Sequence, residues 1–285
     1  MLRSEPMAHV ASACALATAA VLAARTASAQ TDDEARHQPP SETELSREAE
    51  NPVSKLSSFP VRYQNDFGIG AQKLERSAIS LRPTLAFPVT HDLSLVSRTT
   101  IPIASQPDPV HGTYTSGLGD TVESLFLVPR PSSDVIWGVG PSISIPTAIP
   151  TVLGSGWVAV GPTAAVLMQS RLLTLGLLGA QLWSLAGESS RPGIDLLGVK
   201  YIAALHLPRG WYIQTSPVVS ANWNASSFRN MWTIPVGGGA GKVFHLGELP
   251  VNVSVAAYWN VIRPETIVAP SGNVQAQLAL LLPGW

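Results

Sequence analysis

From residue 59 onward, apolar side chains recur at every second position over long stretches of the chain. Within residues 135–146 one face is large and mostly apolar and the other is small or polar. The first face carries Val135, Trp137, Val139, Pro141, Ile143 and Ile145, and the second carries Ile136, Gly138, Gly140, Ser142, Ser144 and Pro146. Residues 251–261 and 274–282 repeat the pattern. A period of two predicts β-strands whose two faces meet different surroundings.

Runs of this kind predict twelve strands. They lie near residues 59–68, 76–88, 93–103, 118–128, 135–147, 156–168, 172–186, 194–207, 211–222, 231–243, 250–261 and 273–283. Strands of about 10 residues or more are long for a soluble domain but suit a tilted crossing of a bilayer. Several prolines, among them Pro83, Pro141, Pro217 and Pro235, fall within these runs. Because proline lacks a backbone N–H, we expect bulges or strand ends there.

Short and long connections alternate along the chain. The short joins lie near residues 90–91, 129–134, 169–171, 208–210 and 245–249, and the longer ones near 104–117, 148–155, 187–193, 223–230 and 262–272. Outer-membrane barrels have short periplasmic turns and long outer loops. The sequence therefore predicts an all-β fold, a transmembrane antiparallel up-and-down β-barrel of about 12 strands, in the bacterial outer membrane.

The composition agrees with a barrel in contact with membrane lipid. Charged residues make up 13% of the chain, against roughly 25% in ordinary soluble domains. No stretch after the N-terminal region approaches the roughly 18 consecutive apolar residues of a membrane-spanning helix. The net charge of −1 and the absence of a basic run argue against nucleic acid as a partner. We expect the barrel-assembly machinery to act on the chain during biogenesis.

The N-terminal region divides into two segments that differ from the barrel. Residues 1–29 are expected to be a signal peptide, with Arg3, an apolar run and the cleavage site Ala27-Ser28-Ala29. Its removal takes away Cys14, the single cysteine, and excludes disulfides and thiol chemistry. Residues 30–58 form an acidic periplasmic tail, with a possible short helix ending near Asn51-Pro52, and this tail could be a partial plug. Residues 59–285 form the barrel.

A ligand site is expected on the inner wall of the barrel. Its candidate residues are Arg62, Arg82, Arg98, Glu123 and Lys200. Folding at the short turns brings three of them together in a predicted Arg82–Arg98–Glu123 cluster, and the net positive wall would favour anions or polarisable ligands. The alternative is that these charges only tie neighbouring strands together. No motif for a metal or a cofactor occurs, so neither is expected.

Six segments resemble a known family. They are NPVSKLSSFP (51–60), LVSRT (95–99), SGLGD (116–120), WGVGP (137–141), GPT (161–163) and LWSLAG (182–187). They resemble bacterial outer-membrane transporters related to the phenol-degradation MetA-pathway group, often mislabelled neuromedin U. The chain departs from that pattern at Gln181, where histidine is expected, and at the glycine-rich residues 237–241. The resemblance implies a barrel and uptake of small, aromatic or hydrophobic compounds, and it implies no catalytic residues.

The expected function is passive, selective passage of small molecules, without catalysis. A non-conducting structural or adhesive barrel is the main alternative. An outer-membrane lipid hydrolase is less favoured, because none of the histidines of the mature chain has a serine and an acid at a convincing spacing. A soluble secreted β-protein would expose Leu173, Leu175 and Leu177 to water, which disfavours it.

Overall fold

The computed structural model describes residues 41–130, 134–266 and 268–282. Residues 41–285 form one compact unit. The predicted signal peptide and residues 30–40 of the predicted tail lie outside the described residues. None of the described helices has the length and apolar character needed to cross a membrane.

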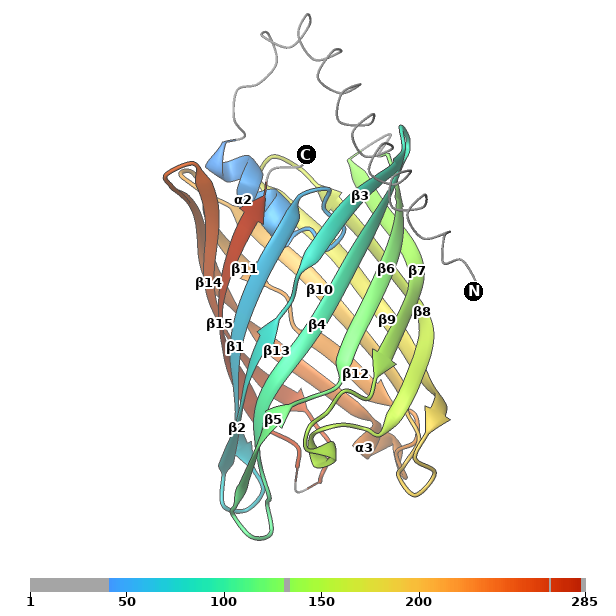
Figure 1. Cartoon of the computed structure of the whole chain (residues 1–285). Coiled ribbons are helices and arrows are strands. Elements are labelled where there is room, and N and C mark those ends of the chain that lie inside the picture. Colours follow the sequence, from blue (N-terminus) through green and yellow to red (C-terminus); the bar gives the residue numbers. More distant parts are fainter. Residues whose placement is uncertain (1–40, 131–133, 267, 283–285) are drawn as a thin grey trace, which may run out of the picture. The chain divides into compact units, whose positions relative to one another are not determined.

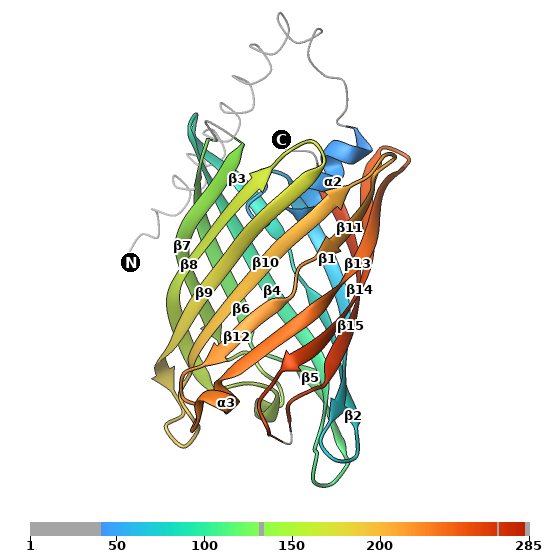
Figure 2. The same cartoon turned by 180° about the vertical axis from the view of Figure 1, so that it is seen from behind.

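One antiparallel β-sheet forms almost all of this unit (Figures 1 and 2). Its strands are β1 (Ser57–Ile69), β2 (Leu74–Leu81), β3 (Thr84–Thr90), β4 (Leu93–Pro107), β5 (Tyr114–Leu118), β6 (Thr121–Pro129), β7 (Val135–Ile145), β8 (Trp157–Gln169), β9 (Leu173–Gly187), β10 (Asp195–His206), β11 (Trp211–Thr215), β12 (Val218–Asn222), β13 (Trp232–Leu246), β14 (Leu249–Ile262) and β15 (Gly272–Leu282). The sheet is closed, because β1 pairs with β15 and β9 pairs with β10.

We call each segment that crosses the barrel wall from one end to the other a stave. Three of the staves each consist of two consecutive strands. These are β2 with β3, β5 with β6, and β11 with β12, so the fifteen strands form twelve staves. Two of the interruptions contain Pro83 and Pro217, and Pro235 lies at a register shift between β13 and β14. Because proline cannot donate a ladder hydrogen bond, the chain leaves the sheet or shifts register there. The predicted twelve-stranded barrel is confirmed, and these three prolines lie where the prediction placed breaks. The prediction is wrong for Pro141, which lies within β7 and pairs in regular register with Pro162 of β8.

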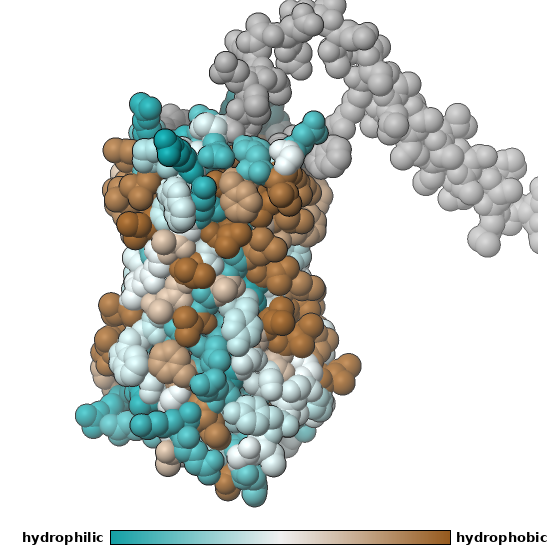
Figure 3. All heavy atoms as spheres, turned by 90° about the vertical axis from the view of Figure 1, so that its left-hand side faces the viewer, coloured by the Kyte–Doolittle hydropathy of each residue, from teal (hydrophilic) through white to brown (hydrophobic). Residues whose placement is uncertain are grey.

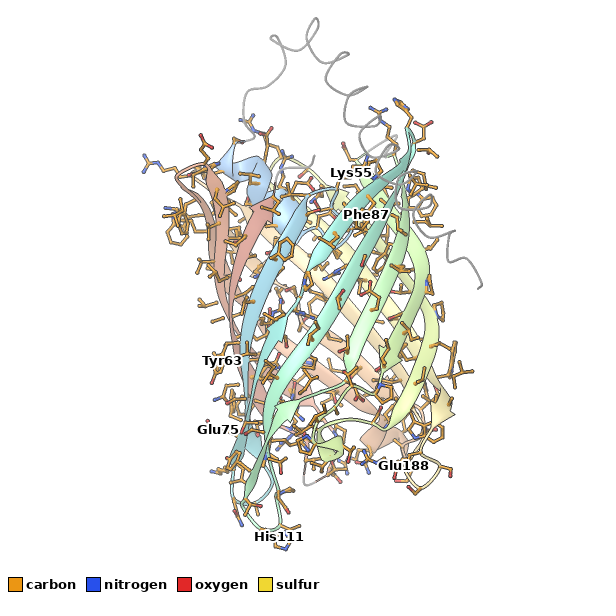
Figure 4. All side chains as sticks on the ribbon, viewed as in Figure 1. Lys55, Tyr63, Glu75, Phe87, His111 and Glu188 are labelled. Carbon is orange, nitrogen blue, oxygen red and sulfur yellow. The ribbon has the colours of Figure 1, made fainter. Side chains whose placement is uncertain are left out.

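The two ends of the barrel differ. Short turns gather at the end that holds helix α2 (Glu42–Glu50), where β1 begins and β15 ends (Figure 1). The longer loops gather at the other end with the 3-10 helix η1 (Thr151–Leu153) and helix α3 (Phe228–Met231). In Figure 4, Lys55 lies at the α2 end, whereas His111 and Glu188 lie at the long-loop end. This is the predicted asymmetry of an outer-membrane barrel.

The outer wall of the barrel is apolar over its middle. Figure 3 shows hydrophobic residues over the middle of one side, with hydrophilic residues gathered toward both rims. On β9, Leu173, Leu175 and Leu177 are 40%, 43% and 50% exposed. Trp183 and Trp259 are exposed near the long-loop end, as Trp137 and Trp211 are near the short-turn end. Aromatic rings flanking an apolar zone are typical of a protein that crosses a bilayer.

Replacing Leu177 by arginine should destabilise the folded barrel in lipid by about 2–4 kcal/mol, because the charge would enter the hydrocarbon layer. Leu172, which is exposed in the turn before β9, supplies the matched control. Leu172→Arg should cost no more than about 1 kcal/mol. Urea unfolding in vesicles measures both changes. Equal and small costs at the two positions would contradict the membrane-facing assignment of β9.

Candidate functional site

A segment ahead of the first strand enters the barrel at its short-turn end. We call residues 41–56 the plug segment. Helix α2 is capped by Ser41, whose side chain accepts from the backbone N–H of Glu44, while the Glu44 carboxylate accepts from the backbone N–H of Ser41. Such reciprocal bonds satisfy helix-end donors. The helix ends at Glu50, with Asn51 as its C-cap before Pro52, and the structure therefore has a helix where the sequence predicted one.

Two apolar clusters hold the plug segment. Leu45 of α2 is 1% exposed and lies in a cluster with Tyr212, Val243 and Leu281 from the barrel wall. Val53, also 1% exposed, lies in a second cluster, whose barrel members are Val96, Phe126, Val128, Ala165, Leu167 and Ile202. Burial of a leucine or valine side chain contributes about 1.5–3 kcal/mol. The plug segment is thus a packed part of the barrel interior.

Polar contacts fix the helix in the same place. The ring of His206 on β10 lies 2.9 Å from Ser46 Oγ through Nδ1 and 2.9 Å from Thr174 Oγ1 through Nε2. Gln169 at the end of β8 donates to the backbone oxygen of Arg47 at 2.9 Å. Buried polar groups with partners on two elements fix the relative position of those elements.

Four cationic side chains line the interior beside the plug segment. We call Arg62, Arg82, Arg98 and Lys200 the cation ring. Arg62 is on β1, Arg82 on the bend after β2, Arg98 on β4 and Lys200 on β10. Strands β1, β2 and β4 are neighbours, whereas β10 lies across the barrel from them. Three arginines therefore face the lysine across the lumen.

The charges of the cation ring are poorly compensated. Arg76, a neighbouring cation, is paired with Asp66 at 2.6 Å. Among the described residues, no ring member forms an ion pair within 4.0 Å. Arg62 donates to the Gln277 side chain at 2.8 Å, and the buried Arg82 Nε has no hydrogen-bond acceptor in the described parts of the chain. Buried charges without counter-ions are costly, so this arrangement is suited to attract an anion.

Glu48 and Glu50 both line a cavity beside the cation ring, and Glu50 is the buried one of the two. Glu50 is the last residue of α2, is 8% exposed, and lines a cavity of about 60 Å³ together with all four ring members. Burial raises the pKa of Glu50, and the charges of Lys200 and Arg62 offset this only in part. The four ring cations and Glu50 together carry a charge of +3 when Glu50 is ionised, a count that leaves out the half-buried Glu48.

Four cavities share lining residues from one end of the barrel to the other. The outermost, of about 440 Å³, lies between the loops around residues 223–231 and 263–270, and it shares Ser220, Thr233 and Pro270 with a lumen cavity of about 620 Å³. The cation ring also lines this lumen cavity and the narrow 60 Å³ cavity. Glu48, Asn51 and Leu56 then border both the narrow cavity and a last one of about 350 Å³. The plug segment lines the narrowest part of the series.

Acidification should increase the positive charge of the cation ring and with it the attraction of the lumen for anions. Because burial raises the pKa of Glu50, its carboxylate takes up a proton at a higher pH than an exposed glutamate, and the ring charge rises from +3 to +4. Reversal potentials recorded from about pH 8 to about pH 4 should show the change with a midpoint above the usual glutamate value of about 4.3. Glu50→Gln should remove this step. An identical step in wild type and Glu50→Gln would contradict the assignment.

The structure brings together four of the five residues that the sequence predicted for the site. Arg62, Arg82, Arg98 and Lys200 all line the lumen cavity. Arg98 pairs with Thr84, two residues from Arg82 on the same face, so the two arginines are near neighbours. They are thus placed together as expected.

Glu123 is the correction to that prediction, because it lies on the other face of the wall. It pairs with Thr99 and accepts hydrogen bonds from Ser97 at 2.6 Å and Thr99 at 2.5 Å. It shares its face with Leu127, which is 46% exposed on the outer wall. The Arg82–Arg98–Glu123 cluster is therefore not formed, and Glu50 is the acid at the cation ring.

Sequence reasoning missed Glu50, because it lies in an acidic segment that was expected to be a tail. The available signal was the apolar spacing of Leu45, Val53 and Leu56 in this polar segment. Three apolar residues at intervals indicate a segment that packs against something, and the acid between them is then buried as well.

The described parts of the chain also contain histidine, serine and acidic side chains, which are the groups found in metal sites and hydrolase triads. No group of three or more histidine, cysteine, aspartate or glutamate side chains there is arranged to hold a metal ion. His206 has a serine beside it, yet its second ring nitrogen contacts Thr174 and not a carboxylate. A Ser-His-Asp triad orients its histidine with an acid at that position.

Sequence comparison found no matching family model and no matching curated protein. The resemblance to the MetA-pathway group thus stays an expectation. Among solved structures, the barrel is similar to a COG4313 outer membrane channel from Pseudomonas putida, with a TM-score of 0.61, 14% identity, and coverage of 89% of this chain and 100% of that one. A FadL homologue from Pseudomonas aeruginosa, at 11% identity, covers 80% of this chain and 90% of that one, with a TM-score of 0.39. Outer membrane phospholipase A from Escherichia coli, at 10% identity, covers 86% and 99%, with a TM-score of 0.43. The fold is a closed antiparallel β-barrel similar to that of the COG4313 protein, and together with the apolar outer wall it supports the predicted location in the bacterial outer membrane.

Proposed function

We propose that this protein is an outer-membrane channel through which small molecules, preferentially anions, pass by diffusion. The observation that carries the proposal is the series of cavities along the barrel axis, narrowed where the plug segment meets the cation ring. A channel needs sites that bind its solute weakly enough to release it. Four cations facing one carboxylate supply such a site for a negatively charged solute.

The size of the lumen favours a selective channel over a general pore. Twelve staves enclose more space than the eight of a barrel filled by its own side chains, but less than the sixteen or so of a porin. Here the plug segment takes up part of that space, through the clusters around Leu45 and Val53. Solutes would therefore pass singly and in contact with the wall.

Uptake into proteoliposomes tests this proposal. Vesicles that contain the refolded mature chain should take up benzoate faster than an uncharged sugar alcohol of similar size, and protein-free vesicles should take up neither at that rate. The preference for benzoate follows from the net positive ring. If none of these solutes enters, the alternative of a non-conducting structural barrel is favoured.

A further inference from the structure

The lumen cavity has two unlike walls. The staves on one side contribute six apolar lining residues, namely Val122, Phe126, Leu178, Ala180, Pro217 and Val218, together with the polar Ser124, Lys200, Ser216 and Ser220. The staves across the barrel contribute polar ones, namely Gln64, Asp66, Arg76, Asn273 and Gln275. A cavity of about 620 Å³ with these walls fits a drug-sized ligand. The ligand that suits it has an apolar body, which would lie against Phe126 and Leu178.

At its plug end the same cavity meets the cation ring. All four ring members line both the lumen cavity and the narrow cavity that contains Glu50. The ring is therefore reached from two sides, by a solute in the lumen and by the plug segment. Arginine binds carboxylates with paired donors in a fixed geometry, and the protein already offers the ring a carboxylate of its own.

We infer that the ligand of this channel is an amphipathic carboxylate, whose carboxylate takes the place of Glu50 at the cation ring and so frees the plug segment. The inference rests on the proposed function and names its substrate class. Glu50 is then an internal substitute for the ligand head group, which lowers the charge of the ring from +4 to +3 while the lumen is empty.

The exchange is balanced in charge. When a ligand carboxylate enters the ring and Glu50 leaves it, the local charge stays at +3, so no buried cation loses its counter-charge. An uncharged ligand of the same shape would leave four cations exposed to each other, which is costly. A ligand carboxylate can therefore replace Glu50 without this electrostatic cost, whereas an alcohol cannot.

Displacement of Glu50 from the cavity that it shares with the cation ring bears directly on the width of the path. Glu50 is followed by Asn51, Pro52 and Ser54, all of which line the narrow 60 Å³ cavity. These residues connect α2 to β1, so movement of Glu50 toward the short-turn end moves the segment that constricts the path. Release of Glu50 would therefore widen the path beside the bound ligand.

Binding is measured with octanoate on the refolded mature chain in lipid vesicles, with octanol and acetate as probes that lack the charge or the apolar body. Octanoate should bind at least about tenfold more tightly than either, since charge-assisted hydrogen bonds and burial of the chain both contribute. Arg98→Ala should weaken octanoate binding about tenfold and leave octanol binding unchanged. Equal binding of octanoate and octanol would overturn the inference.

Release of the plug segment is measured at Ala49, which packs partly buried against the Leu45 cluster. The mature chain expected after removal of Cys14 has no cysteine, so Ala49→Cys introduces a single thiol. Octanoate should raise its rate of reaction with a water-soluble maleimide about tenfold over octanol, the ratio expected from the binding difference. An unchanged rate would overturn the inference.

Glu50→Gln gives a signature that a merely structural role would not give. Without the competing carboxylate, octanoate should bind about tenfold more tightly than to wild type, while maleimide labelling should no longer respond to it. Glu42→Gln removes a charge from the other end of α2, at a residue outside the lining of both cavities, and should match wild type in both readouts. If Glu50→Gln binds octanoate as wild type does and still responds, the exchange is wrong.

Different results would contradict the proposed channel function and the inferred ligand class. If vesicles take up benzoate but octanoate binds no better than octanol, the channel stands and the ligand class is wrong. If no solute crosses even after removal of the plug segment, the proposed function is wrong, whatever the binding of octanoate.

Discussion

Deletion of residues 41–56 is expected to raise the single-channel conductance of the barrel about tenfold. The expectation follows from the position of the plug segment, because its residues line the small cavity of about 60 Å³ that adjoins the lumen cavity of about 620 Å³. Nothing in the barrel ladder depends on these residues, since β1 begins at Ser57 and pairs with β15 and β2. The barrel should therefore still form, with an open lumen of the size that twelve staves enclose.

A point substitution separates the effect of the plug segment from that of chain length. Leu45→Asp places a carboxylate in the cluster with Tyr212 and Leu281, where an unpaired charge is strongly unfavourable. Undocking of α2 should raise the conductance in the same direction as the deletion. Both proteins should keep the gel mobility shift on heating that marks a folded barrel. A folded deletion variant with the conductance of wild type would show that the plug segment does not restrict the path.

Reversal of two ring charges is expected to reverse the ion selectivity. In Arg82→Glu/Arg98→Glu, two cations and three acids remain at the ring, and the local charge changes from +3 to −1. Charges at a constriction act on ions at short range and in a low-dielectric surrounding, so their sign decides which ion passes. The anion-to-cation permeability ratio should fall from above one to below one.

The matched control for this reversal is Arg130→Glu. Arg130 is exposed beside His91 in the short turn after β6, away from the lumen. The same substitution there should leave the permeability ratio close to that of wild type, because exposed charges are screened by salt. A double ring variant that stays anion-selective, in a folded barrel, would place the selective step somewhere other than the cation ring.

The number of staves was predictable because each residue of a stave faces either lipid or the lumen. The alternation of apolar and polar side chains in Val135–Ile145 and Gly272–Leu282 follows from these two environments. The breaks at Pro83 and Pro217 were predictable as well, since proline cannot take part in a ladder. What decides these features is local, and local patterns are visible in a sequence.

The position of Glu123 was not predictable in the same way. Leu118 of β5 pairs with Ile103, whereas Thr121 follows after an irregular pair, Gly119-Asp120, and Glu123 pairs with Thr99. The register sum changes by one residue across that break. A shift of one residue in register turns every later side chain to the other face of the sheet. No feature of the sequence predicts the register shift at Gly119-Asp120.

The role of Glu50 depends on contacts between distant parts of the chain. Glu50 shares its cavity with Arg62, which is twelve residues away in the sequence, and with Lys200, which is 150 residues away from Glu50. The acidic composition of residues 30–58 predicts a solvated tail. The packing of Leu45 and Val53 against barrel residues shows that the plug segment is instead buried inside the barrel. A local sequence pattern does not show which distant residues the closure of the barrel brings close to Glu50.

The measurement that bears most directly on the central claim is the reversal potential of the refolded, plug-containing mature protein in a planar bilayer under a salt gradient. The account predicts a small current whose reversal potential has the sign of anion selectivity. A cation-selective current, or a complete lack of current from both this protein and the form without residues 41–56, would contradict it.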